Sequence, residues 1–185
     1  MSGPSAWSEW IGLADLRSGP VTRLIAADRD ARRALADDLG VDRLDRLEAE
    51  VSVAPWLDGA VIDARWSAVI EQTCGVTLEP FGTELAGAFS VRALPSSSPH
   101  APKEPTREVA VDPEAEDPPD LLDEDRVDLA GYVVEHLALE IDPFPRRPGA
   151  VFEPPAEPPA EEQPPSPFAA LRDLQPKPGA KPGQD

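Results

Sequence analysis

One short stretch combines residue types that can bind nucleic acid. Phe144, Arg146 and Arg147 lie between Pro143 and Pro148. An arginine guanidinium group can donate two parallel hydrogen bonds to a phosphate, and a phenylalanine ring can stack on a base. The prolines restrict the backbone, so these side chains would keep a defined arrangement. The alternative interpretation is a rigid turn in which the arginine pair neutralises nearby carboxylates, because isolated arginine pairs are commonly solvated surface groups.

Residues that carry most catalytic chemistry are sparse in this chain, which has one cysteine and two histidines. Cys74 continues the apolar face of an expected strand, so packing explains it best. A cysteine nucleophile needs a neighbouring base, but His100 falls in a Ser- and Pro-rich stretch and His136 lies among apolar helix positions. No nucleotide-binding glycine loop, nucleophile elbow or paired-histidine zinc motif occurs. We predict a non-enzymatic protein with no catalytic residues, no metal site and no cofactor.

A second candidate contact lies near the C-terminus. Phe168, Leu171 and Leu174 recur at helical spacing after a Ser-Pro pair that suits a helix start. This pattern predicts a short helix at 167–174. A helix of this length is marginal alone. It therefore either docks on the preceding domain or binds in a groove of a partner protein, and the sequence leaves both possibilities open.

The distribution of charge indicates which partners are favoured. The chain carries a net charge of −18, and residues 96–126 alone contain ten acidic and three basic side chains. Such acidity opposes non-specific binding to nucleic acid and favours basic partners. Because large apolar residues are almost absent from 96–120, we predict a disordered acidic loop there. The Pro-rich composition of 151–185 predicts a tail outside a single domain at 1–150.

The elements that must position these residues follow from the periodicity of apolar residues. Strict alternation predicts antiparallel strands, and apolar residues three or four apart predict helices. The fold class is α+β: an antiparallel meander sheet that curls into a partly open barrel, with two covering helices and disordered acidic and Pro-rich linkers. The expected strands are 7–16, 21–26, 46–53, 60–74, 85–93 and 121–122, and the expected helices are 29–39 and 128–141.

Several residues have specific structural expectations. Asp28 or Asp30 should cap the first helix, Gly40 should end it, and Asp128 should cap the second helix. Trp66 shares a face with apolar neighbours and belongs in the core. Trp10 and Trp56 are candidate interface residues.

The expected location is the cytoplasm. No apolar run approaches the roughly 18 residues that a membrane span needs. The N-terminal sequence MSGPSAWSEW lacks the basic-then-apolar layout of a signal peptide. A single cysteine suits a reducing compartment. We therefore expect no membrane partner.

Four pieces of the sequence together resemble one family. They are the helix 28–40 that leads into strands 46–53 and 60–74, the segment Gln72–Pro80 with its Cys-x-x-x-Leu-x-Pro pattern, the Asp-Leu helix from Asp128 to the turn at Pro145, and the Ser-Pro-Phe-Ala-Ala-Leu-Arg-Asp-Leu box at 166–174. Their order and spacing are similar to those of the YceD family, the large ribosomal RNA subunit accumulation proteins.

This resemblance implies a non-enzymatic cytoplasmic protein needed for normal accumulation of large-subunit ribosomal RNA. Genes of the family often neighbour the gene of a small, basic ribosomal protein of the large subunit. Some members carry extra cysteines that look capable of binding a metal ion. This chain keeps only Cys74, so the resemblance implies no zinc site here.

Two functional hypotheses follow. In the first, the protein is a ribosome biogenesis factor that binds pre-ribosomal RNA or particles through Phe144, Arg146 and Arg147. In the alternative, it is an acidic chaperone or adaptor for a basic ribosomal protein of the large subunit. That partner would be held by the acidic loop 104–125 and the helix around Phe168. The net charge of −18 favours the alternative.

Overall fold

The computed structural model describes residues 6–102 and 117–152. The chain divides into two units, residues 1–151 and 152–185, and the helices and strands of the described residues all belong to the first unit. The middle of the predicted acidic loop and the predicted helix at 167–174 lie outside the described residues.

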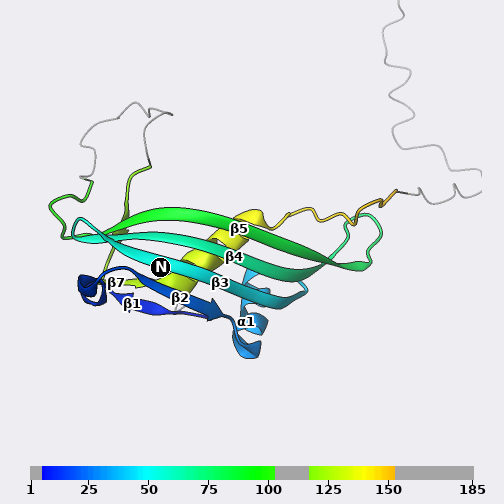
Figure 1. Ribbon diagram of the computed structural model, residues 1–185. Coiled ribbons are helices and arrows are strands. Elements are labelled where there is room, and N and C mark those ends of the chain that lie inside the picture. Colours follow the sequence, from blue (N-terminus) through cyan, green and yellow to red (C-terminus); the bar gives the residue numbers. More distant parts are fainter. Residues whose placement is uncertain (1–5, 103–116, 153–185) are drawn as a thin grey trace, which may run out of the picture. The chain divides into compact units, whose positions relative to one another are not determined.

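The main sheet has five strands in the order β2-β3-β4-β5-β6 (Figure 1). The first four pair antiparallel in chain order, which confirms the predicted meander, and β6 lies parallel to the end of β5. A parallel pair needs a long crossover connection, which the chain between β5 and β6 supplies. The bounds are β2 Val21–Ala26, β3 Arg43–Trp56, β4 Gly59–Thr73, β5 Pro80–Pro95 and β6 Asp120–Leu122.

The sheet is not closed into a barrel, so the predicted curling into a partly open barrel is not confirmed. Strands β2 and β6 are its two edges and do not pair with each other. Barrel closure requires consistent tilt and register around the ring. Strand β6 has only three residues, so it offers too little pairing to bridge the two edges.

The buried face of the sheet is organised around one tryptophan. In the register of the strands, Ile25 lies opposite Ala49, Ala49 opposite Trp66, and Trp66 opposite Gly87. The Trp66 side chain is buried, as predicted, and so are its apolar neighbours along β4. A Cβ atom added to Gly87 would lie 2.8 Å from the Trp66 ring. The ring therefore occupies the space that the missing side chain leaves.

A second, two-stranded sheet joins the N-terminus to the chain that follows the acidic loop. Strand β1 (Trp10–Gly12) pairs antiparallel with β7 (Arg126–Asp128). The predicted strand over 7–16 is confirmed only for Trp10–Gly12, because residues 7–9 are not in a strand and a 3-10 helix, η1 (Leu13–Ser18), follows Gly12. The Asp15 carboxylate accepts a hydrogen bond from the Gly12 N–H at 3.1 Å. This local bond favours a tight turn over a continued strand.

Helix α1 (Arg29–Leu39) packs against β3 near the end of β2 (Figure 1). Its ends follow the prediction: the Asp28 carboxylate accepts from the Ala31 N–H at 2.8 Å, and Gly40 adopts the left-handed conformation with φ of 68°. A side chain at that φ would be strained.

Helix α2 (Leu129–Glu140) crosses the sheet behind β3–β5 in the view of Figure 1. Its buried face consists of Leu129, Ala130, Val133 and Leu137. Asp128 occupies the N-cap position, but the predicted capping bond is wrong. Its carboxylate instead accepts from the Glu9 N–H at 3.0 Å, so it ties the start of α2 to the chain before β1.

The first residues of the predicted acidic loop 96–120 are hydrogen-bonded to the domain. Ser98 is buried, and its hydroxyl donates to the Asp58 carboxylate at 2.8 Å. The Ser96 N–H donates to the Leu122 carbonyl at 2.9 Å. The predicted short strand at 121–122 is confirmed as β6.

The fit between Trp66 and Gly87 can be tested by adding one methyl group. Gly87→Ala should lower the free energy of unfolding by about 1–3 kcal/mol, because the new Cβ overpacks the indole ring. Gly82→Ala on the same strand is the matched control, since its Cβ would meet nothing closer than the Ile70 carbonyl oxygen at 3.9 Å. Urea unfolding measures both variants. Equal midpoints would contradict this close packing.

Candidate functional site

The turn Pro143–Pro148, which we call the C-terminal turn, and Asp142 just before it form three hydrogen bonds with the end of β4 and the two residues that follow it. The Gln72 side-chain amide donates to the Asp142 carbonyl at 3.1 Å. The Gly75 N–H donates to the Pro145 carbonyl at 2.9 Å. The Arg147 N–H donates to Cys74 Sγ at 3.4 Å. These bonds join the end of α2 to the β4–β5 connection, and they are the contacts expected of a rigid turn.

The three residues predicted to contact RNA have different surroundings in this turn. Arg147 Nη1 lies 2.7 Å from Glu79 Oε2, so its charge is paired, although with a carboxylate that the sequence did not indicate. The guanidinium group of Arg146 forms no ion pair or hydrogen bond with any described residue. The side chain of Phe144 is 79% exposed. Arg146 and Phe144 are therefore the two members of the set available to a partner.

Cys74 is fully buried where the C-terminal turn meets the sheet. Its Sγ also accepts from the Val76 N–H at 3.4 Å. The Thr77 hydroxyl and the N–H groups of Arg147 and Thr77, in that order, lower the pKa of the thiol from 9.0 to about 6, against the opposing effect of desolvation. The Thr77 oxygen itself has no partner of normal hydrogen-bond geometry among the described residues, so the backbone donors are the better-defined contacts. The arrangement favours a thiolate that holds two loops together.

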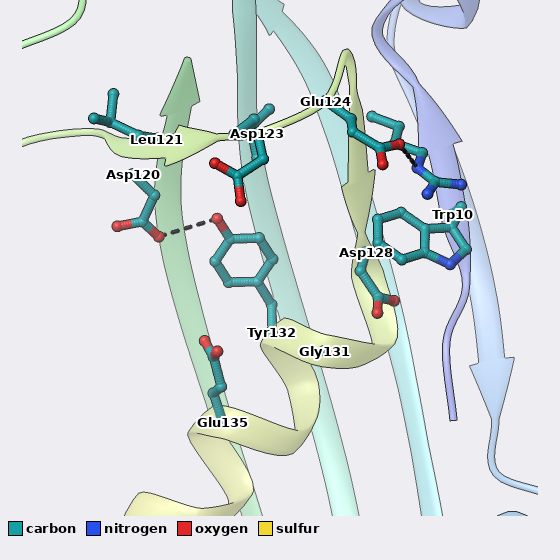
Figure 2. Close-up of a pocket in the computed structure, with 11 residues that line it drawn as sticks. Trp10, Asp120, Leu121, Asp123, Glu124, Asp128, Gly131, Tyr132 and Glu135 are labelled. Atoms are coloured by element: carbon teal, nitrogen blue, oxygen red, sulfur yellow. Dashed lines mark hydrogen bonds and ion pairs between the residues drawn. The ribbon is translucent and has the colours of Figure 1, made fainter. Parts of the chain in front are cut away.

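An acidic cleft of about 600 Å³ lies at the opposite end of α2 (Figure 2). Strands β6 and β7 and the first turns of α2 form its walls. Figure 2 shows Asp120, Asp123 and Glu135 gathered around the ring of Tyr132. The lining residues are Trp10, Asp120, Leu121, Leu122, Asp123, Glu124, Arg126, Asp128, Gly131, Tyr132 and Glu135.

The carboxylates of this cleft are only partly satisfied within the domain. Asp120 accepts from the Tyr132 hydroxyl at 3.0 Å, and Glu124 pairs with Arg126 at 2.6 Å. Asp123 and Glu135 have no side-chain partner among the described residues. Burial, followed by the negative charge of Asp120, raises the pKa of Tyr132. The phenol therefore stays protonated and remains a hydrogen-bond donor.

Apolar surface borders the same cleft. Trp10 is 51% exposed and Leu121 is 50% exposed. The Arg126 guanidinium group lies 4.1 Å from the centre of the Trp10 ring. The cleft thus combines uncommitted negative charge with an aromatic face that already holds a cation from the chain itself.

Both histidines have structural surroundings. The His136 ring stacks on Phe89 with centroids 3.8 Å apart, and its Nδ1 lies 2.9 Å from the Tyr132 carbonyl oxygen. The backbone N–H of His100 donates to the Ser98 hydroxyl. Across residues 6–102 and 117–152, no three side chains of the His, Cys, Asp or Glu type are grouped as a metal ion would require.

Sequence reasoning missed the acidic cleft as a unit, although parts of its signal were visible. Trp10 is predicted as an interface residue, and the acidity of 96–126 is plain. What places Tyr132 and Glu135 beside those carboxylates is the long-range pairing of β1 with β7 and the parallel pairing of β6 with β5. Neither pairing leaves a local pattern. Phe168, Leu171 and Leu174 lie outside the described residues.

One comparison with known proteins places this chain in a family. A family model described as "Large ribosomal RNA subunit accumulation protein YceD" matches residues 62–175. The match covers more than half of the chain, and the chain belongs to this family. It includes most of β4, the C-terminal turn and the box at 166–174, whereas the resembling helix at 28–40 precedes it. No curated protein and no solved structure matches the chain.

Among the described residues, no helix is long and apolar enough to span a bilayer.

The thiolate contact gives a pH-dependent prediction. Because the pKa of Cys74 falls from 9.0 to about 6 on folding, its contribution to stability is complete above about pH 9 and is lost as the pH falls through 6. Cys74→Ser keeps a hydrogen-bond acceptor that does not titrate in this range. The difference in urea midpoint between the native protein and this variant should therefore grow from pH 6 to pH 9. A difference that stays constant over this range would exclude a thiolate.

Proposed function

We propose that this protein supports accumulation of large-subunit ribosomal RNA as a non-catalytic adaptor in the cytoplasm. In this proposal the acidic cleft binds a Lys/Arg-rich segment of a basic ribosomal protein and delivers it to the pre-ribosomal particle. Family membership supports the role in accumulation of large-subunit ribosomal RNA. The acidic cleft is the observation that supports binding of a basic segment.

The chemistry of the cleft suits a lysine or arginine side chain. Asp123 and Glu135 offer negative charge that no described residue neutralises. The exposed faces of Trp10 and Leu121 offer apolar surface for the hydrocarbon stem of such a side chain. Arg126 over Trp10 shows that the aromatic face accommodates a guanidinium group.

A basic segment would gain more than one contact in this cleft. Its positive charges would be attracted by a local excess of carboxylates, and attraction of this kind mainly accelerates association and selects partners by charge. The acidic loop 104–125 enters the described part of the chain beside the cleft, at Asp117–Asp120. We propose that this loop adds further negative charge to the same surface. The box at 166–174 remains a predicted docking helix.

Direct contact with ribosomal RNA at the C-terminal turn is the second candidate. The supporting observation is that Phe144 is 79% exposed next to Arg146, whose charge is not paired within the described residues. Hydrogen bonds from the turn to the sheet would hold both side chains in place for a base and a phosphate. Arg147 would position the turn through Glu79 rather than contact RNA.

The adaptor proposal can be tested with a fluorescent peptide of alternating lysine and alanine residues. Asp123→Asn combined with Glu135→Gln should weaken its binding about tenfold at low salt, because two charge-assisted contacts are lost. Asp63→Asn combined with Glu84→Gln is the matched control, because both carboxylates are exposed and lie on the sheet outside the cleft. Fluorescence anisotropy measures the affinity. If both double variants bind equally well, the cleft is not the peptide site.

The RNA proposal for the C-terminal turn needs a different readout. Phe144→Ala combined with Arg146→Ala should reduce co-sedimentation of the protein with precursors of the large subunit severalfold, because stacking and one phosphate contact are lost. Leu139→Ala combined with Arg17→Ala removes an equally exposed apolar side chain and an exposed arginine elsewhere. If the Phe144/Arg146 variant sediments with the precursors as well as this control does, the C-terminal turn does not contact RNA.

A further inference from the structure

Helix α1 presents three arginines on one face. At about 100° per residue, Arg29, Arg32 and Arg33 fall within roughly one hundred degrees of the helix circumference. Asp30 and Asp38 lie outside this arc. Together with Arg43 of β3, the three arginines line a hollow of about 460 Å³. The participation of β3 in this hollow is a long-range feature that no local sequence pattern indicates.

The charge order along α1 is unfavourable for the helix itself. Its first two turns carry the three arginines, and its last turn carries Asp37 and Asp38 with no basic residue. The helix dipole favours the opposite order, with acidic side chains near the N-terminus and basic side chains near the C-terminus. Asp28 and Asp30 offset only part of this cost. A charge order that opposes the helix dipole, without a compensating contact for each arginine, is typical of a functional surface.

The four arginines of the hollow divide into two fixed and two free side chains. Arg32 Nη1 donates to the Asp45 carbonyl, which is available because the pairing of β3 with β4 shifts register between Leu44 and Arg46. Arg43 pairs with Asp45 at 2.7 Å and with Glu71 at 3.1 Å. The guanidinium groups of Arg29 and Arg33 have no ion pair or hydrogen bond among the described residues.

Three carboxylates, those of Asp37, Asp42 and Asp45, also line the hollow. Asp42 accepts a hydrogen bond from the Thr73 hydroxyl at 2.8 Å, and Asp37 has no ion pair among the described residues. The Asp45 and Glu71 side chains are engaged by Arg43. Arg32 keeps its Nε buried without an acceptor among the described residues, and an unsatisfied charged donor is costly. An anion brought to this hollow would meet two uncommitted guanidinium groups, those of Arg29 and Arg33 at i and i+4, whose Cβ atoms lie about 5–6 Å apart. These two positive charges exceed the single charge of the unpaired Asp37 carboxylate.

We propose that this arginine face of α1 binds the phosphate backbone of ribosomal RNA. Arginine forks match phosphate geometry, and the chain belongs to a family described by accumulation of large-subunit ribosomal RNA. An acidic protein segment is the competing partner and is distinguished by the test below. The proposal does not depend on the acidic cleft, and it is separate from the C-terminal turn, because none of its arginines belongs to either.

The test uses the full chain, labelled fragments of large-subunit ribosomal RNA and labelled polyglutamate. Arg29→Gln combined with Arg33→Gln should weaken RNA binding about tenfold or more. It should also reduce the slope of log affinity against log salt by about 1.4, since each phosphate contact on a single strand contributes about 0.7. Arg17→Gln combined with Arg65→Gln, two exposed arginines elsewhere that are not paired within the described residues, should change neither quantity.

The thermal midpoint separates a binding effect from a folding effect. Removing positive charge from the first turns of α1 should leave the midpoint unchanged or raise it, because those charges oppose the helix dipole. Equal RNA affinity and salt slope in both double variants would overturn the proposal. Tighter binding of polyglutamate than of RNA, lost in the Arg29/Arg33 variant, would overturn it in favour of an acidic protein partner.

Discussion

The close packing of Trp66 against Gly87 is the constraint on which the rest of the domain depends. Its ring needs small residues on both neighbouring strands, and the register supplies Ala49 on one side and Gly87 on the other. A slip of one residue would turn every side chain of β4 to the opposite face. The tryptophan therefore fixes the pairing of β3, β4 and β5 together, and with it the position of both ends of the sheet.

The two candidate sites follow from that register at opposite ends of β4. Near Ala60, the last residues of β5 pair with β6, and β6 supplies the wall of the acidic cleft. Near Thr73, the β4–β5 connection receives the C-terminal turn and brings Glu71 to Arg43 beside α1. Helix α2 runs between these ends, with Tyr132 in the cleft and Ile141 just before the turn. Helix α2 thus links the acidic cleft with the C-terminal turn.

The elements that could be predicted from the sequence are those whose signal is local. Alternation located β3 to β5, and Asp28 with Gly40 marked both ends of α1. The errors arise where a distant segment competes with a local pattern. Asp128 looks like a helix cap, yet its carboxylate bonds to Glu9, more than one hundred residues away. The barrel was expected from sheet size alone, but the short strand β6 provides an edge rather than a closure.

The candidate sites were harder to predict for the same reason. The sequence drew attention to Phe144, Arg146 and Arg147 because prolines surround them. It could not show that Glu79 pairs with Arg147 and not with Arg146. It gave no sign that Arg32 and Arg43 lie together. The register shift at Asp45, which anchors Arg32 beside Arg43, depends on how β3 meets β4. Residue types were therefore readable, whereas their groupings required the fold.

The net charge of −18 is a poor guide to what each surface can bind. Strand β4 has 15 residues, which corresponds to about 50 Å at roughly 3.3 Å per residue. Exposed charges are largely screened beyond about 8–10 Å at ordinary salt. The carboxylates of the cleft are therefore electrostatically remote from Arg29 and Arg33. The proposed phosphate site at α1 depends on the local balance of four arginines against Asp37, Asp42 and Asp45, of which Asp45 is already paired with Arg43. An acidic chain can on this basis present both an anion-binding and a cation-binding surface, provided that the sheet keeps them apart.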